Sequence, residues 1–261
     1  MVMDMKKPLI ITALYNIGRD SWNNFTMSYN TYLAWMENTL HIDREMVVFT
    51  EEKFIDKIKE FRSKIDPEGN KTTYIIEPLE ELYAYKRWNH QLEELQFSDE
   101  FKDKKSFDVP EMNEPLYNII MFNKLYWLQK ALEINPSFTH LIWLDAGGIR
   151  IPITNSDWPD HDKIPDNQIL HFSHKPSVEI DRGNEWYAMS QVRHIQGTAF
   201  VVPSTKIDWY AEEVARTIDE CIAQRFIGSD EKMFDLTYVK QDPSKFHLEV
   251  QSWREYYDWF L

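Results

Sequence analysis

The sequence has little cysteine, little glycine and fewer basic than acidic residues, and each shortage excludes a class of protein. Its 261 residues include one cysteine, Cys221, so no disulfide can form within the chain and no cysteine cluster can bind a metal. The 29 Lys and Arg residues against 43 Asp and Glu residues give a formal net charge of -14, which opposes binding to nucleic-acid phosphates. We therefore expect a cytoplasmic protein that binds no nucleic acid.

Long hydrophobic runs and several well-known motifs are also missing. The apolar stretch after Lys7 has only about eight residues, whereas a membrane span needs about 20, so we expect no transmembrane segment and at most peripheral membrane contact. The patterns G-x-G-x-x-G, G-x-x-x-x-G-K-[ST], G-x-S-x-G and H-E-x-x-H do not occur. Their absence argues against a dinucleotide-binding oxidoreductase, a P-loop NTPase, an α/β-hydrolase and a zinc protease.

Short apolar segments alternate with longer helical patterns, which is typical of a mostly parallel sheet flanked by helices. With 43% hydrophobic residues and no repeat or long linker, the sequence favours a single α/β domain over residues 1–261. The predicted strands are residues 8–15, 45–50, 72–77, 140–145, 168–173 and 198–202. The predicted helices are residues 21–40, 51–65, 78–96, 116–134 and 208–225, with a charged loop at residues 98–114.

The segment THLIWLDAGGIR is the strongest local signal for a functional site. Its apolar strand ends at Asp145, and the glycine pair Gly147 and Gly148 follows directly. Ligands of open α/β sheets bind outside the carboxyl ends of the strands, and glycines let a ligand approach the backbone. Asp145 is therefore a candidate for contact with a cation or a sugar hydroxyl. The alternative is a turn-forming aspartate that caps the next segment.

Lys124 is the second candidate, because helical spacing places it on the apolar side of its segment beside Tyr117, Ile120 and Leu128. An unpaired buried charge is costly, so an inward lysine requires an anionic partner. That partner is either a ligand phosphate or a carboxylate of the protein.

Three other segments carry polar residues at the ends of predicted strands or helices. In TALYNIGR, Tyr15 and Arg19 follow the first strand, where they could hold a base and a phosphate. In IQGTAFVVP and GSDEKMF, Gly197 precedes a strand, and Asp230 and Glu231 could supply a catalytic carboxylate or could only cap a helix. His247 could complete a cation site with Asp145 or could pack in the core.

Five segments taken in order resemble the HtrL/YibB family of bacterial proteins: ITALYNIGRDSW, SYNTYLAWM, NKLYWLQKALEINPSFTHLIWLDAGG, GSDEKMF and KFHLE. The resemblance implies a glycosyltransferase with a Rossmann-like GT-A fold. Such an enzyme moves a sugar from a nucleotide-sugar donor to a hydroxyl of a glycan acceptor, here in surface polysaccharide or lipopolysaccharide biosynthesis. The alternative is a non-catalytic carbohydrate-binding or assembly protein with the same fold.

The resemblance also implies roles for individual residues. It places Lys124 near the donor and Asp230 or Glu231 on the acceptor side. If the transfer inverts configuration, Glu231 or Asp230 would be the catalytic base; if it retains configuration, these acids would instead orient the acceptor or stabilise positive charge at the anomeric carbon. The nucleotide-sugar site would be formed by Ala13, Tyr15, Arg19, Lys124, Asp145, Ala146, Gly147 and Gly197.

The resemblance also implies a divalent cation, but the sequence departs from the family's usual metal-binding motif. The usual Asp-x-Asp motif is replaced by Asp145-Ala146-Gly147, so glycine stands where the second acid would be. One carboxylate with phosphates and water can still hold Mn²⁺ or Mg²⁺, and His247 is the candidate second ligand. Alternatively, Lys124 and Arg19 neutralise the diphosphate without a metal.

Overall fold

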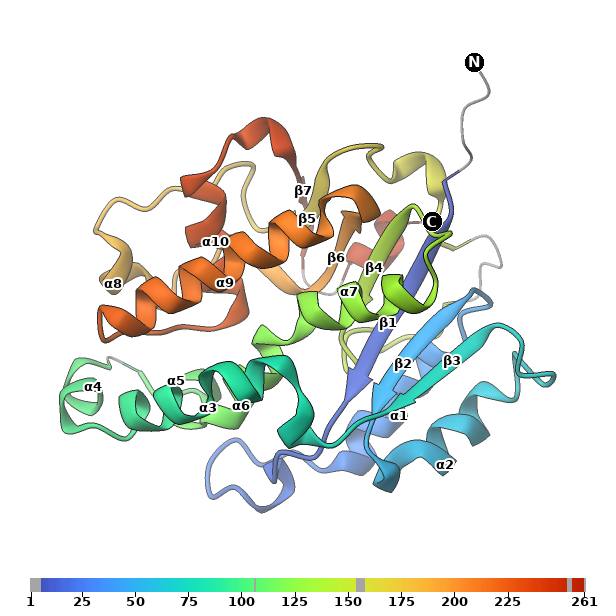
Figure 1. The fold of residues 1–261 in the computed structure, drawn as a ribbon, viewed down its shortest axis with the longest axis horizontal. Helices are drawn as coiled ribbons and strands as arrows, with labels where there is room; N and C mark the ends of the chain where they lie inside the picture. Colours follow the sequence, from blue (N-terminus) through green and yellow to red (C-terminus); the bar gives the residue numbers. More distant parts are fainter. Residues whose placement is uncertain (1–5, 106, 154–157, 253–254, 261) are drawn as a thin grey trace.

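A seven-stranded sheet forms the centre of the computed structural model, which describes residues 6–105, 107–153, 158–252 and 255–260 (Figure 1). The strand order is β3-β2-β1-β4-β6-β5-β7. The strands are β1 (Pro8–Leu14), β2 (Met46–Thr50), β3 (Thr72–Ile76), β4 (His140–Leu144), β5 (Ile169–Ser173), β6 (Ile195–Pro203) and β7 (Phe246–Val250). This sheet confirms the predicted α/β class, and each of the six predicted strands is present with shifted ends.

Strand β6 is the exception to the parallel arrangement, because it runs antiparallel to both of its neighbours, β4 and β5. Its pairing with β5 also shifts register between His171 and Ser173, which pair with Phe200 and Ile195. Irregular pairing of this kind bends a strand and redirects its backbone groups. Gly197 lies within the irregular stretch, close to the carboxyl end of β4.

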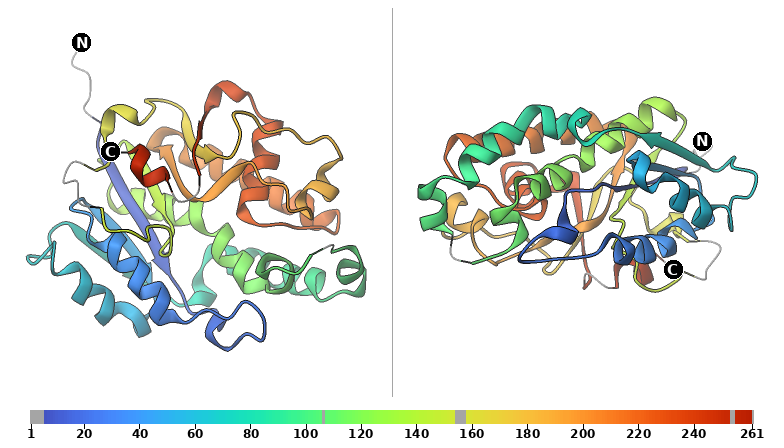
Figure 2. Two further views of the ribbon diagram at one scale, coloured as in Figure 1. Left: turned by 180° about the vertical axis from the view of Figure 1, so that it is seen from behind. Right: turned by 90° about the horizontal axis from the view of Figure 1, so that it is seen from below.

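Helices cover both faces of the sheet (Figures 1 and 2). One face carries α1 (Tyr29–Leu40) and α2 (Glu52–Arg62), and the other carries α7 (Lys124–Ile134), α9 (Ile207–Ala223) and α10 (Asp230–Lys240). The remaining α-helices are α3 (Tyr83–Gln96), α4 (Asp99–Lys104), α5 (Pro110–Asn113), α6 (Pro115–Phe122), α8 (Asn184–Ala188) and α11 (Tyr256–Trp259). Short 3-10 turns lie at Arg19–Ser21, Leu79–Glu81, His161–Lys163, Ser204–Lys206 and Pro243–Lys245.

Alternation along the strands builds a separate apolar core on each face. In β1, Leu9 and Ile11 belong to the core under α7 and α9, whereas Ile10 and Leu14 belong to the core under α1 and α2. Because both faces are covered, the central strands are apolar along most of their length, as expected for buried strands.

In two of the predicted helices, a polar side chain sets a boundary that the sequence did not predict. The predicted helix 21–40 begins only at Tyr29, because the side chain of Ser28 accepts a hydrogen bond from the backbone of Thr31 and caps the helix there. The predicted helix 116–134 is divided into α6 and α7 at Asn123, whose Oδ1 accepts a hydrogen bond from the backbone of Ala84. Lys124 is therefore the first residue of a helix.

The predicted loop at residues 98–114 was wrong, since it contains α4 and α5. Ser98 caps α4 by accepting a hydrogen bond from the backbone of Phe101, and α5 begins with Pro110. Phe101 and Met112 are buried in the core, so tertiary packing stabilises helices too short to show a clear helical pattern.

Candidate functional site

A cavity of about 270 Å³ opens at the carboxyl ends of β1 and β4, and we call it the first chamber. Six predicted site residues line it. Tyr15 and Arg19 come from the loop after β1, and Asp145 comes directly after β4. The others are Ala13, Ala146 and Gly147. Because β1 and β4 are neighbours in the sheet, their carboxyl ends bring two distant parts of the sequence to one place.

A second chamber of about 360 Å³ adjoins the first and is lined by the remaining predicted residues except His247. These are Lys124, Gly197, Asp230 and Glu231. The two chambers share the lining residues Tyr117, Met121, Asp145, Arg150 and Thr198. Asp145 therefore stands at the junction of one continuous site.

Lys124 lies between two aspartates at this junction. Its Nζ is 2.8 Å from Oδ1 of Asp145, 2.7 Å from Oδ2 of Asp230 and 2.9 Å from the carbonyl oxygen of Gly197. An ammonium group has three N–H donors, so these three acceptors satisfy it fully. Burial disfavours the charged form of Lys124, but the two carboxylates outweigh that effect and raise its pKa. Of the two alternatives for the partner of Lys124, the structure contains the internal ion pair.

Gly197 permits this arrangement because it has no side chain. A Cβ atom there would overlap the carboxylate of Asp230. The glycine lets α10 approach β6 closely enough for Asp230 to reach Lys124, which comes from α7. Three elements thus meet at one buried ammonium group.

Glu231 follows Asp230 in the first turn of α10 and has different partners. Its carboxylate lies 3.1 Å from Nη1 of Arg193 and accepts a 3.3 Å hydrogen bond from the backbone of Gly197. Arg193 also pairs with Glu111 at 2.8 Å. Burial raises the pKa of Glu231 to about 7, with a further contribution from Asp230, although Arg193 opposes the shift. A carboxyl group with this pKa can exchange protons near neutral pH.

Arg19 lies within a group of aromatic rings in the first chamber. Its guanidinium carbon is 5.4 Å from the ring centre of Tyr117, 5.6 Å from that of Tyr32 and 5.7 Å from that of Trp22. Nη1 donates to the hydroxyl of Tyr32, and Nε donates to the carbonyl of Phe25 at 3.2 Å. These contacts orient a delocalised cation toward the chamber.

Arg150 is a second cation on the same chamber, from the segment that follows the Gly147-Gly148 turn. Its guanidinium carbon is 4.0 Å from the ring centre of Trp35. Sequence reasoning assigned no role to Arg150, Arg193 or the aromatic side chains of α1. Their sequence signal was weak, although Arg150 ends the same motif as Asp145 and Arg193 lies two residues before β6.

Tyr15 lines the first chamber but presents little surface to it. The side chain is 4% exposed and stacks on Trp127, with ring centres 5.4 Å apart. Trp127 in turn stacks on Trp143 at 5.4 Å, and Nε1 of Trp143 donates to Oδ1 of Asp145 at 2.6 Å. The stacked rings therefore hold Trp143 in place, and Trp143 in turn orients the carboxylate of Asp145.

His247 lies apart from this site. It sits on β7, paired in register with Leu170 of β5, and its Nε2 is 3.3 Å from Oε2 of Glu249. Strands β5 and β6 separate it from β4. The structure thus brings together Asp145, Lys124, Asp230 and Glu231, but not Asp145 and His247.

A divalent cation does not fit the donor groups present at Asp145. Oδ1 of Asp145 already accepts hydrogen bonds from Lys124 and Trp143, and Oδ2 of Asp230 accepts from Lys124. In the part of the chain that the structure describes, no group of three or more His, Cys, Asp or Glu side chains is placed to hold a metal ion. Mn²⁺ and Mg²⁺ prefer several oxygen ligands, and the carboxylate oxygens that face each other here are already bonded to Lys124.

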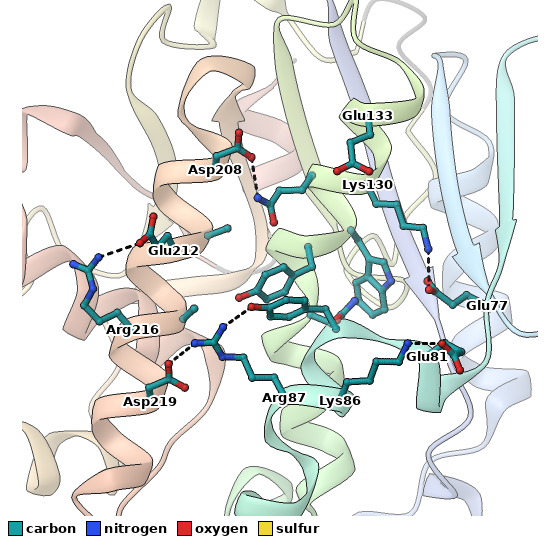
Figure 3. Close-up of a pocket in the computed structure, with 17 residues that line it drawn as sticks. Glu77, Glu81, Lys86, Arg87, Lys130, Glu133, Asp208, Glu212, Arg216 and Asp219 are labelled. Carbon is teal, nitrogen blue, oxygen red and sulfur yellow. Dashed lines mark hydrogen bonds and ion pairs between the residues drawn. The ribbon is translucent and has the colours of Figure 1, made fainter.

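A larger groove of about 820 Å³ lies between α3, α7 and α9 (Figure 3). Its charged side chains pair with one another, as in Lys130 with Glu77, Lys86 with Glu81 and Arg87 with Asp219. None of the predicted site residues lines it. The two chambers, rather than this groove, form the candidate site.

The family model described as "Bacterial protein of unknown function (HtrL_YibB)" matches residues 6–261. This chain belongs to the HtrL/YibB family. The match confirms the resemblance seen in the sequence, and it assigns no activity. A search of the curated proteins finds no match to this chain.

Several solved structures are similar to this HtrL/YibB chain at 10–13% identity. A glycosyltransferase involved in glycosylation of the major capsid of PBCV-1 has 13% identity and a TM-score of 0.41, covering 96% of this chain and 82% of that one. The galactosyltransferase LgtC, solved with donor and acceptor sugar analogs, has 12% identity and a TM-score of 0.42, with 88% and 70% covered. The 4-diphosphocytidyl-2C-methyl-D-erythritol synthase of Anaerococcus prevotii has 11% identity and a TM-score of 0.41, with 95% and 89% covered. TM-scores below 0.5 assign no activity.

Among the residues described, no helix has the length and apolar character needed to span a bilayer.

Proposed function

We propose that this protein transfers a sugar from a nucleotide-sugar donor to a hydroxyl of a glycan acceptor in surface polysaccharide or lipopolysaccharide biosynthesis. The observation that supports it is the pair of connected chambers that meet at Asp145. One chamber is aromatic and carries arginines, as a nucleoside diphosphate requires. The other carries carboxylates, as the activation of a hydroxyl requires.

Asp145 would hold the donor sugar at the junction. Its side chain is 28% exposed, and Oδ1 is bonded to Lys124 and Trp143, so Oδ2 is the oxygen that would bind the sugar. A carboxylate oxygen accepts hydrogen bonds from sugar hydroxyls. The ion pair with Lys124 fixes the carboxylate in place, which keeps the anomeric carbon near the second chamber.

Glu231 would accept the proton of the acceptor hydroxyl in an inverting transfer. The acceptor oxygen forms a bond to the anomeric carbon, and the bond from that carbon to the diphosphate oxygen breaks. The electron pair leaves with the nucleoside diphosphate, and the acceptor proton moves to Glu231. Asp230 is less suited to this role because its Oδ2 is already bonded to Lys124.

Release of UDP or GDP from UDP- and GDP-sugars, or of CMP from CMP-sugars, tests the proposal, together with thermal shifts caused by UDP, GDP and CMP. We expect turnover with one donor, lowered at least about tenfold by Asp145→Ala. Asp208→Ala is the matched control, since Asp208 lines the groove of Figure 3. No release and no thermal shift across the panel would reject the enzyme and favour a non-catalytic carbohydrate-binding protein. If Asp145→Ala leaves both binding and turnover intact, the site is wrongly assigned.

A further inference from the structure

We infer that the ammonium group of Lys124 occupies the position of a divalent cation, so that the protein binds its nucleotide without a metal ion. This inference rests on the proposed function and specifies how the donor's negative charge is balanced. It concerns Lys124 of α7, Asp230 of α10 and Asp145, which directly follows β4.

The geometry around Lys124 leaves no place for a second cation between the two aspartates. Nζ of Lys124 lies within 2.7–2.8 Å of both carboxylates, and its third donor bonds to the carbonyl oxygen of Gly197. The side chain is 1% exposed, so the ammonium group is held inside the protein by these three acceptors. A metal ion at the same carboxylate oxygens would be repelled by this ammonium group.

The chain also supplies cations of its own where the phosphates would bind. Arg19 and Arg150 both line the first chamber with Asp145. A guanidinium group can bind phosphate oxygens in a bidentate manner, and the contacts of Arg19 with Tyr32 and Phe25 hold it ready for such binding. The guanidinium group of Arg19 would then balance negative charge on the phosphates that a metal ion would otherwise balance.

Mn²⁺ titration followed by electron paramagnetic resonance tests the position of Lys124 directly, without any donor or acceptor. We expect the wild-type protein to have no Mn²⁺ site that depends on Asp145. Lys124→Ala removes the ammonium group and should create such a site, which Lys124→Ala/Asp145→Asn should lose. A folded Lys124→Ala protein that binds no Mn²⁺ contradicts the inference.

The wild-type protein decides the question even if Lys124→Ala does not fold. Wild type and Asp145→Asn are then compared in the same titration. Mn²⁺ binding by the wild type that Asp145→Asn abolishes overturns the inference.

Calorimetry with UDP, GDP, ADP and CMP separates this inference from the proposed function. After treatment with excess EDTA, we expect one nucleotide to bind with a Kd that changes less than about twofold when Mn²⁺ is added. Binding that needs Mn²⁺, with a gain of about tenfold or more, overturns the metal-free site but leaves the proposed function standing. If none of the four binds under either condition, the proposed function itself is rejected, and the inference with it.

Discussion

A Cβ atom on Gly197 would overlap the carboxylate of Asp230, so the absence of a side chain in β6 determines how closely α10 can approach. The same glycine accepts a hydrogen bond from Lys124 through its carbonyl oxygen and donates one to Glu231 through its amide. One residue thus contacts three of the charged side chains of the site. Its replacement should therefore affect the site more than its small size suggests.

Gly197→Ala should displace Asp230 and separate it from Lys124. Overpacking of a buried position costs about 1–3 kcal/mol, so we expect a loss of unfolding free energy in that range. Chemical denaturation measures the loss, and nucleotide calorimetry measures the effect on the site. The double variant Gly197→Ala/Asp230→Ala removes the overlapping carboxylate, so its stability should exceed that expected from adding the two single effects. Strict additivity would refute the overlap.

Glu231 should govern the pH dependence of turnover. Its pKa is raised to about 7 by burial, and a base acts in its deprotonated form. We therefore expect kcat/KM to rise with pH and to level off above about 7, and Glu231→Gln to lower it by at least about 100-fold. The remaining activity of Glu231→Gln should lack the rise. A variant that keeps the wild-type profile would show that another group is the base.

Asp235 should be needed for stability rather than for turnover, although it lies one helical turn after Glu231. It is fully buried, and it accepts hydrogen bonds from the hydroxyl of Tyr187 at 2.5 Å and the backbone of Ile195 at 2.9 Å and of His194 at 3.3 Å. Asp235→Ala leaves three buried donors unpaired, so we expect a loss of about 3 kcal/mol. Glu231→Gln is the contrasting variant and should lose activity with little loss of stability.

The effect of Asp235→Ala should also depend on pH. Burial raises the pKa of Asp235 from 3.8 to about 7, so the folded state holds this proton more tightly than the unfolded state. The stabilisation from that proton is complete below the unfolded pKa and disappears as the pH rises through about 7. The stability difference between wild type and Asp235→Ala should therefore be larger near about pH 5 than near about pH 8. A constant difference would show that Asp235 is ionised throughout.

Arg19→Lys should weaken nucleotide binding although the charge is kept. A lysine lacks the planar group that donates to Tyr32 and Phe25 and cannot bind two phosphate oxygens in the same way. We expect Kd for the nucleotide to rise about tenfold, measured by calorimetry. Arg216→Lys is the matched control, because Arg216 lines the other groove and pairs with Glu213. An unchanged Kd in Arg19→Lys would place the phosphates elsewhere.

The sequence predicted the sheet well because buried strands carry a strong apolar signal. The direction of β6 could not be predicted, because nothing in the composition of Ile195–Pro203 distinguishes an antiparallel strand from a parallel one. The start of α1 at Ser28 and the break at Asn123 depend on single hydrogen bonds. The bond of Asn123 is to Ala84, which is distant in the sequence, so the spacing of apolar residues does not indicate it.

The site could be predicted only in part, because several of its contacts form between elements that are distant in the sequence. Asp145 could be found because it follows a buried strand directly, and the inward position of Lys124 followed from helical spacing. That Lys124 bonds to both Asp145 and Asp230 could not be predicted, because the three residues are brought together only when α7 and α10 pack against β4 and β6. The position of His247 likewise depends on the order of the strands, which places β7 at the edge.

The stacked rings of Trp127 and Trp143 give the site a spectroscopic property of its own. Their planes lie within 5° of parallel, and the indole N–H of Trp143 is bonded to Asp145. Indole emission responds to nearby charge, and circular dichroism of coupled indoles responds to their relative orientation. A ligand that contacts Asp145 should therefore change the fluorescence and circular dichroism of this tryptophan pair, so binding can be measured without an attached label.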